Sequence, residues 1–463
     1  ARRRGLRLAY RIAAVLLWRL RFRHLGIWTP LLLAWVVVLL FEPLAVLQAG
    51  FWLSFGAVAV LLLVFGGRLG VRSMGWSWWH AQWTIALGLL PFFLLLGLPI
   101  SASGPLANLI AVPWVSFLVV PLALLGVLLL PVPWLGEGLL WLAGFLLEVL
   151  FQLLASIAAL LPAWLPMLLP FWAWLLIALG VLCVLAPPGV PLRLPGLIML
   201  VLLCFTPQQL PQEGQAEVWQ LDVGQGQALL VRTRSHALLY DAGPSFGDFD
   251  LGERVVVPSL RALGIDRLNL MLLSHADNDH AGGALAIRQQ LQVDQVLSGE
   301  AARLDPRVQA EVCRDGASWQ WDGVRFTTWH WAQAASSNAL SCVLKVEAAG
   351  ESLLLTGDID SQAERWLINQ GRDVQVDWLQ VPHHGSRSSS SAFFLNTVAP
   401  RGALLSRGHN NQFGHPHPQV LARYQARGIE VHDSVHSGAL RIRLGANEAP
   451  TAWRAQPRFW REK

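Results

Sequence analysis

The chain has 463 residues, enough for two or three domains. Hydrophobic residues make up 54% and charged residues only 14%, a balance that excludes a chain soluble over its whole length. The net charge of +5 is unevenly placed: residues 1–206 hold 11 Arg and 3 Glu, whereas the remainder holds 24 basic and 27 acidic residues. The second half therefore has a net charge of −3 and is not a basic nucleic-acid binder by bulk charge.

The first 24 residues contain eight Arg and no acidic residue, with Leu, Val and Trp between the arginines. This pattern predicts a basic amphipathic helix over residues 1–24 that lies on the cytoplasmic surface of a membrane. The chain begins Ala-Arg-Arg-Arg, without Met and without a signal peptide. We therefore expect it to be part of a longer protein.

Residues 25–206 are predicted to form a polytopic transmembrane domain. Between Ser73 and Arg193 the only charged residues are Glu137 and Glu148, and a stretch so apolar belongs in lipid. Apolar runs recur along the region, at 28–48, 50–66, 82–100, 106–130, 138–160 and 163–186.

A further apolar run, 196–205, decides on which side of the membrane the rest of the chain lies. The run has only about half the length usually needed to span hydrocarbon. If it crosses, the C-terminal half lies outside the cytoplasm, which is the side we favour. If it only dips into the membrane, that half is cytoplasmic.

Residues 207–214 are predicted to be a linker, after which short β-like runs alternate with helical patterns. The β-like runs are 217–223, 228–232, 237–240, 268–273, 324–328, 342–346, 352–356, 378–381 and 403–406. The helical patterns are 256–263, 281–291, 361–369 and 418–427. Such a mixture predicts a layered α/β sandwich over residues 215–463, and we expect a solvated end from Arg441 onward.

The polar half contains two cysteines, Cys313 and Cys342. They can form a disulfide if this half lies outside the cytoplasm. The sequence leaves both the bond and the side of the membrane open.

Four metal-ligand side chains fall within six residues, directly after the apolar run 270–273. They are His275, Asp277, Asp279 and His280. Side chains on a tight loop at a strand end can converge on one point from several directions, as a divalent metal requires. The string therefore predicts a metal centre.

Further candidate ligands stand where other apolar runs stop: Asp241, Asp358 and the pair His383-His384. Asp and His also end strands because they favour turns, and Asp241 taken alone fits that interpretation equally well. Two His-rich clusters with a Gly-Asp between them instead favour one shared site at a sheet edge.

These segments resemble a known family. The string at 274–283 resembles the metal motif of the metallo-β-lactamase superfamily, with Asp277 where many members carry a second His. Together with 221–226, 240–243, 356–358 and 382–386, it resembles the C-terminal domain of the ComEC family of DNA-uptake proteins. The segments 50–55 and 105–109 are similar to the ComEC competence domain, and 413–418 also fits.

The resemblance covers nearly the whole chain. It implies a polytopic α-helical membrane domain followed by an αββα metallo-β-lactamase-like domain. Full-length members carry an additional N-terminal region with an OB-like domain, so the resemblance also implies an N-terminal truncation.

Two positions depart from the family pattern. Many members read Asp-Val-Gly-Gln-Gly-Asp, whereas the last position here is Gln227. The third His of the zinc enzymes has no clear equivalent, because we expect His330, which lies between two Trp, to be packed. Asn338 and Ser341 are candidates for that space.

The function implied by the resemblance is DNA internalisation in natural transformation. One strand would pass through the membrane domain while a metal-dependent nuclease degrades the other. The candidate catalytic residues are Asp279, His280, Asp358 and His384. The candidate metal ligands are His275, Asp277, Asp279, His280, Asp358, His383 and His384. Candidates for supporting a ligand or contacting phosphate are Asp222, Gln225, Asp241, Asn338, Ser341, Ser386, Arg387 and His415.

The ligand set suits two divalent ions, about 3.5–4 Å apart in such sites. One ion would be held by His275, Asp277 and either His383 or His384. The other would be held by Asp279, His280 and a bridging Asp358. The oxygen-rich set favours manganese and leaves zinc open.

The expected location is the bacterial inner membrane, as a multi-pass protein. Expected partners are lipid, single-stranded DNA in transit, other competence proteins including a DNA receptor, and further copies of the chain. The chain has no Gly-x-x-x-x-Gly-Lys loop, so a driving ATPase would be a separate protein. Two alternatives stay open: a channel with a non-hydrolytic DNA-binding domain, or a membrane-tethered metallo-hydrolase of another ester.

Overall fold

The computed structural model describes residues 26–66, 73–98, 100–101, 103–161, 169–187, 189–202, 210–247, 249–446 and 448–454. The chain divides into two compact units, residues 1–207 and 208–463, which we describe separately. The helix predicted over residues 1–24 and the start of the predicted linker lie outside the described residues.

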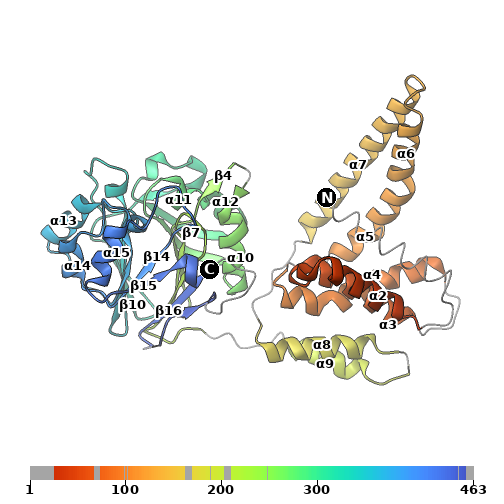
Figure 1. The fold of residues 1–463 in the computed structure, drawn as a ribbon, viewed down its shortest axis with the longest axis horizontal. Coiled ribbons are helices and arrows are strands. Elements are labelled where there is room, and N and C mark those ends of the chain that lie inside the picture. The colour runs from red at the N-terminus through yellow and green to blue at the C-terminus, as the bar shows by residue number, and fades with distance from the viewer. Residues whose placement is uncertain are drawn as a thin grey trace. The chain divides into compact units, whose positions relative to one another are not determined.

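The first unit is helical (Figure 1). Its described elements are α2 (Thr29–Phe41), η1 (Pro43–Leu47), α3 (Ala49–Phe65), α4 (Met74–Leu95), α5 (Ser103–Trp114), η2 (Val115–Val119), α6 (Val120–Leu128), α7 (Leu135–Leu160), α8 (Phe171–Leu185) and α9 (Arg193–Leu202). Among the described residues, two helices are long and apolar enough to cross a membrane, Ser103–Leu128 and Leu135–Leu160. The helices α2, α3, α8 and α9 are apolar but shorter.

Helix ends in the first unit differ from the predicted runs for local reasons. The run predicted at 82–100 begins at Met74 as α4, because the side chain of Ser73 accepts the backbone N–H of Trp76 and caps the helix. Residues 196–202 of the short run predicted at 196–205 lie in α9, which packs closely on α8. A Cβ added to Gly196 would lie 2.6 Å from the carbonyl oxygen of Gly180.

The second unit contains two large β-sheets and a small hairpin. The first sheet has the order β17 (Thr451–Ala452), β16 (Leu440–Leu444), β1 (Ala216–Gln220), β2 (Leu229–Arg232), β3 (Ala237–Tyr240), β6 (Arg267–Leu273), β7 (Gln292–Ser298), β8 (Glu311–Val312). The second has the order β15 (Glu430–Asp433), β14 (Gly402–Leu405), β13 (Trp378–Gln380), β12 (Glu351–Leu355), β11 (Val343–Ala348), β10 (Val324–Trp329), β9 (Ser318–Trp321). The hairpin pairs β4 (Ser245–Phe246) with β5 (Phe249–Asp250).

Helices cover the outer faces of both sheets (Figure 1). The first sheet carries η4 (Gly252–Val256), α10 (Val257–Ala262), α11 (Asn278–Ala281) and α12 (Ala284–Gln290). The second carries α13 (Ser361–Asn369), α14 (Ala392–Val398) and α15 (Pro418–Gln425). One apolar core lies between the sheets, and each outer face has its own core. The unit is thus a four-layered αββα sandwich.

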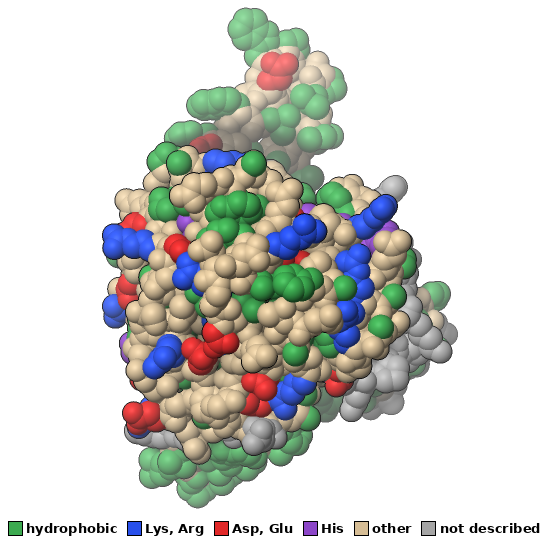
Figure 2. All heavy atoms as spheres, turned by 90° about the vertical axis from the view of Figure 1, so that its left-hand side faces the viewer, with side chains coloured by type: hydrophobic (Ala, Val, Ile, Leu, Met, Phe, Trp, Pro, Cys, Tyr) green, Lys and Arg blue, Asp and Glu red, His purple; other side chains and the backbone are tan. Residues whose placement is uncertain are grey.

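Charges of both signs are interspersed on the face of the second unit seen in Figure 2, in keeping with the balanced charge of this half of the chain. On the right of that view several Lys and Arg side chains gather in a row, whereas elsewhere the two signs are mixed. Attraction of a polyanion therefore has to come from local groups.

The expectation of a solvated end from Arg441 onward was wrong for residues 441–444, which belong to strand β16 (Leu440–Leu444) next to β1. Leu440, Ile442 and Leu444 point into the core between the sheets, whereas the side chains of Arg441 and Arg443 lie near Glu217. The alternation of Leu, Arg, Ile, Arg and Leu is typical of a half-buried strand.

A disulfide joins Cys313 to Cys342. Both residues are buried in the core between the sheets. The bond links the segment after β8, the edge strand of the first sheet, to the residue before β11, which lies between β10 and β12 in the second sheet, and so connects the two sheets covalently.

Candidate metal centre

The parallel strands β3 and β6 end side by side, and the metal-ligand string follows β6 directly. Asp277 precedes the short helix α11, which places Asp279 and His280 in its single turn. On the other sheet, Asp358 follows β12, and the two His residues follow β13 in a tight turn. His383 and His384 both have positive φ angles, 51° and 52°, a conformation that the tight turn imposes on them.

Four ligand atoms converge from the two sheets, those of Asp279, His280, Asp358 and His384. They all lie within 4.8 Å of one another. The Nε2 atom of His280 is 3.1 Å from Oδ1 of Asp358 and 3.2 Å from Nε2 of His384. The Nε2 atom of His384 is 3.3 Å from Oδ2 of Asp279. We call these four residues the inner cluster.

These separations suit ligands of one metal ion, because ligand atoms about 2.0–2.2 Å from a common centre lie roughly 3–4 Å apart. Two buried atoms of candidate ligands also lack hydrogen-bond partners among the described residues: Oδ1 of Asp358 within the cluster and Nε2 of His275 beside it. Buried polar atoms are normally satisfied, and a cation would satisfy these. The residues present therefore fit a divalent ion.

Three further ligand candidates lie beside the inner cluster, and we call them the outer group: His275, Asp277 and His383. Nε2 of His275 is 3.5 Å from Oδ2 of Asp277, and Nε2 of His383 is 3.6 Å from Oδ2 of Asp358. Asp358 thus turns one oxygen toward each set. Of the two His residues that the sequence left as alternatives for the first ion, His384 lies in the inner cluster and His383 in the outer group.

Asp241 lies beneath the inner cluster, fully buried. Its Oδ2 atom is 2.8 Å from Nδ1 of His280, and its carboxylate also accepts hydrogen bonds from the N–H and hydroxyl of Ser274. A hydrogen on Nδ1 of His280 leaves the lone pair of Nε2 facing the other ligands. This is the supporting contact predicted for Asp241.

Gln227 also belongs to this support. Its side-chain amide donates to Oδ2 of Asp241 at 3.0 Å, and its backbone N–H donates to the carbonyl oxygen of Asp279. The Gln227 side chain therefore faces Asp241 and supports its carboxylate. Gln227 is not one of the four clustered ligands. The departure from the family pattern at Gln227 leaves the cluster complete.

The carboxylates of the cluster are ionised at neutral pH. Burial on its own would raise the pKa of Asp279, but the imidazoles of His280 and His384 outweigh burial and lower that pKa to about 2. Burial also opposes ionisation of Asp358, and the same two imidazoles bring its pKa well below the usual range. In the metal-free site these shifts depend on protonated His280 and His384, whose own pKa values are raised because the facing carboxylates outweigh burial, so a cation would bind with release of the imidazole protons.

The outer group has its own support, which the sequence did not reveal. Asp277 is 40% exposed at its side chain, and its Oδ1 atom accepts from the hydroxyl of Ser337 and lies 3.5 Å from Nη2 of Arg303. Glu300 binds the same Arg303 and Ser337 and also accepts the backbone N–H of Ala276. Glu300 follows β7, a strand missing from the sequence prediction, and recognising that strand would have marked Glu300 as a strand-end carboxylate.

Three other predicted residues lie close to the ligands. The amide nitrogen of Asn338 is 3.3 Å from Nδ1 of His383. The hydroxyl of Ser341 accepts the backbone N–H of Asp358 and is 3.5 Å from Nδ1 of His275. The ring of His415 lies edge-on against that of His383, with centroids 5.7 Å apart.

The remaining predicted residues make other contacts. Asp222 is paired with Arg454, and Gln225 accepts the backbone N–H of Gly408. Ser386 bonds to the hydroxyl of Ser388, and Arg387 is exposed on the turn after the two His residues. His330, as expected, is packed away from the ligands, with Nδ1 2.9 Å from the carbonyl oxygen of Cys313.

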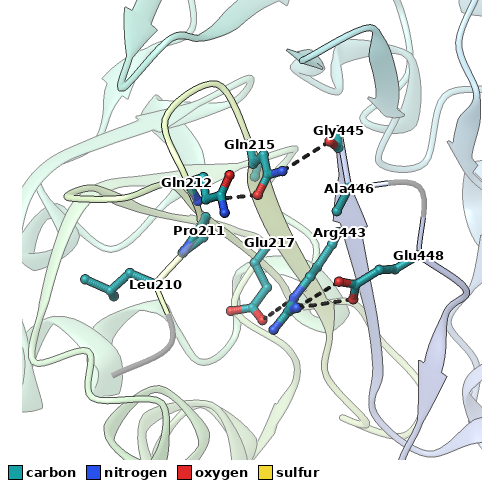
Figure 3. Close-up of a pocket in the computed structure, with 10 residues that line it drawn as sticks. Leu210, Pro211, Gln212, Gln215, Glu217, Arg443, Gly445, Ala446 and Glu448 are labelled. Carbon is teal, nitrogen blue, oxygen red and sulfur yellow. Dashed lines mark hydrogen bonds and ion pairs between the residues drawn. The ribbon is translucent and has the colours of Figure 1, made fainter. Parts of the chain in front are cut away.

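A pocket of about 490 Å³ opens at the other edge of the first sheet, around the start of β1 and the end of β16 (Figure 3). Within it, Arg443 lies between Glu217 and Glu448 and is paired with both. The pocket contains none of the candidate site residues. The chemistry therefore concentrates at the edge where β3, β6, β12 and β13 end.

Two family models match the chain: "Competence protein" over residues 6–191 and "Metallo-beta-lactamase superfamily" over residues 221–409. The second unit is thus a metallo-β-lactamase domain, whose fold implies binding of a divalent metal. A Competence domain covers most of the first unit. The two domains together show that the chain belongs to the ComEC family of competence proteins.

The chain is 36% identical to "Competence protein ComA" of Neisseria gonorrhoeae, over 93% of this chain and 61% of that protein. It is 32% identical to "Recombination protein 2" of Haemophilus influenzae, over 87% and 56%. It is 28% identical to "ComE operon protein 3" of Bacillus subtilis, over 94% and 60%. The chain therefore spans less than two thirds of these relatives' length. Among solved structures, it is similar to a diphosphatase of the PhnP family, with 16% identity and a TM-score of 0.30 over 50% of this chain and 99% of that one.

Proposed function

We propose that the chain acts in DNA uptake during transformation, with a second unit that hydrolyses phosphodiester bonds of DNA in a metal-dependent way. Membership of a family of competence proteins supports the role in uptake. The observation that supports hydrolysis most directly is the inner cluster, with its Asp241 support intact. We assign the catalytic site to Asp279, His280, Asp358 and His384.

The chain's own groups would prepare this site for a phosphate. A divalent ion bound at such a cluster lowers the pKa of a coordinated water and neutralises charge on a phosphate. Asp241 holds His280 in a fixed orientation, and the exposed Arg387 supplies a cation that can pair with phosphate oxygens. Manganese is the ion we favour for the oxygen-rich set, with a second ion in the outer group.

The first unit would form the passage through the membrane. Two of its described helices have the length and composition of membrane spans. Large apolar side chains such as Phe117 and Trp141 are exposed on these helices, which suits contact with lipid. We propose a multi-pass protein of the bacterial inner membrane that conducts a single strand and works with a DNA receptor and a separate ATPase.

We place the second unit on the periplasmic or extracellular side. The disulfide between Cys313 and Cys342 supports this side, because such bonds persist in oxidising compartments and are rare in the cytoplasm. Labelling of an introduced cysteine tests on which side of the membrane the second unit lies. The exposed Glu311 is a suitable position, whereas Glu300 is not, because its side chain supports Asp277. We expect a membrane-impermeant maleimide to label a cysteine at 311 in intact spheroplasts.

The test of the hydrolytic function is a nuclease assay of the purified chain in detergent, with metal content measured on the same samples. We expect hydrolysis of single-stranded DNA that depends on manganese and is lost in Asp279→Ala. A variant that loses the ion but keeps full activity would contradict the site assignment. A wild-type chain that binds DNA without cutting it would favour the non-hydrolytic alternative.

A further inference from the structure

The surroundings of the inner cluster contain a row of aromatic rings that leads to the surface. His383 lies against Asp358, and the ring of His415 lies edge-on against His383. The ring of Phe413 is stacked on His415, with centroids 5.8 Å apart and an angle of 27° between the planes. Phe413 itself is 58% exposed. The row therefore begins at the candidate ligand His383, continues with His415 and ends at Phe413, a large apolar ring that faces solvent.

The loop that carries Phe413 is held at both ends by the site. The N–H of Gly408 donates to the side-chain oxygen of Gln225, and the N–H of His417 donates to the carbonyl oxygen of Gly385, next to His384. Inside the loop, the side chain of Asn411 donates to the carbonyl oxygens of Gly408 and His415 and accepts the N–H of His415. The Phe413 ring is thus presented on a backbone fixed at several points.

Single exposed apolar residues are common on proteins and need no function. Phe413 differs from them because its ring is in contact with the site through His415 and His383. A second loop at the site shows the same feature. Ser245 at the start of the β4–β5 hairpin is bonded twice to Asn278, which lies between Asp277 and Asp279, and Phe246 and Phe249 of this hairpin are exposed.

We propose that Phe413 is a substrate-positioning residue whose exposed face stacks on an unpaired base next to the phosphodiester held at the inner cluster. Every base has a flat π face, so such a ring holds single-stranded DNA without regard to sequence. Bases inside a duplex are stacked on one another and cannot offer that face. The substrate class of the site is therefore single-stranded or frayed DNA. This inference rests on the proposed function.

The test compares Phe413→Ala with a matched control, Phe393→Ala. Phe393 is 54% exposed on α14 and belongs to no part of the site. Binding of a fluorescein-labelled oligothymidylate to the full chain in detergent is followed by fluorescence anisotropy. We expect about tenfold weaker binding for Phe413→Ala, the loss of one stacked base, and no change for Phe393→Ala. Phe413→Trp should bind as tightly as the wild type.

An abasic oligomer of the same length separates stacking from general damage to the loop. The wild type should prefer the base-bearing oligomer, and Phe413→Ala should lose that preference. Equal weakening for both oligomers, or equal binding by Phe413→Ala and Phe393→Ala, would overturn the inference.

Hydrolysis of bis(p-nitrophenyl) phosphate, a diester without bases, distinguishes this inference from the proposed function. We expect the ratio of activity on the oligonucleotide to activity on this small diester to fall about tenfold in Phe413→Ala. If the wild type hydrolyses neither substrate, the proposed hydrolysis fails. The anisotropy measurement still decides whether Phe413 stacks on bases, because it does not depend on cleavage.

Discussion

The inner cluster and the outer group lie next to each other but are supported differently. His280 and His384 are buried and are oriented by Asp241 and by the carbonyl oxygen of Ser406. Asp277, in contrast, is partly exposed and is held by side chains that are themselves at the surface, including Arg303. Buried, hydrogen-bonded ligands lose less freedom when they bind an ion. The contrast rests on the two held imidazoles, since His275 of the outer group is also buried and the Asp279 side chain is 32% exposed. From these imidazoles we expect the inner cluster to bind an ion more tightly than the outer group.

The largest effect should follow from loss of an inner ligand. Asp279→Ala should remove the ion and reduce manganese-dependent hydrolysis by more than the roughly 100-fold that a supporting residue can cost. Metal analysis and hydrolysis of a small diester measure both quantities. Asp277→Ala is the matched carboxylate of the outer group, and a loss in Asp277→Ala as large as that in Asp279→Ala would break the comparison.

Removal of the disulfide should destabilise the second unit as a whole, because the bond lies in the core between its two sheets. The bond closes a loop with a sequence separation of 29, and its loss should lower the free energy of unfolding by about 3–4 kcal/mol. Guanidinium titration of the oxidised chain and of the Cys313→Ala, Cys342→Ala double variant measures this difference. Unchanged stability would mean that the bond does not form in the folded chain.

Asp241→Asn should weaken metal binding about 10- to 100-fold, because the amide can present an N–H to His280 and loses the negative charge. Competition with a chelator measures the affinity. The variant keeps nearly the same shape, so its unfolding curve is the control. Unaltered affinity in a folded variant would show that the support of His280 has no energetic role.

The smallest effect should come from Arg303→Ala. Arg303 lies at the surface, and exposed ion pairs contribute only about 0–1 kcal/mol. We expect a change in metal affinity below tenfold, confined to a second, weaker ion. A titration that resolves two manganese ions would then lose only the weaker step. Loss of the tighter step would contradict the assignment of Arg303 to the outer group.

The sequence marked the candidate ligands more readily than the residues that support them. The seven candidate ligands were found because they follow apolar runs at strand ends, a pattern visible in any one segment. Glu300 and Arg303 were missed because β7 carries Gln and Asp among its apolar residues and three of its seven residues are exposed, so no clear alternation marks it as a strand. Ser337 lies in an irregular loop for which no pattern exists.

The strands of the fold were likewise predicted where the local pattern is clear and missed where it is not. The strands with continuous apolar character, such as β3 and β6, were predicted to within a residue or so. The strand β16 was missed because its arginines suggested a solvated tail. Pairing with β1, more than 200 residues earlier in the chain, makes it part of the core, and contacts so distant in sequence leave no local signal.

The inner cluster takes two of its residues from each sheet: Asp279 and His280 follow β6, whereas Asp358 and His384 follow β12 and β13. An ion bound there joins segments about a hundred residues apart, as a covalent bridge would. The four ligands can meet only after the sheets have packed face to face. Metal uptake would therefore come late in folding, and it would hold the two sheets together at the edge where the candidate ligands lie.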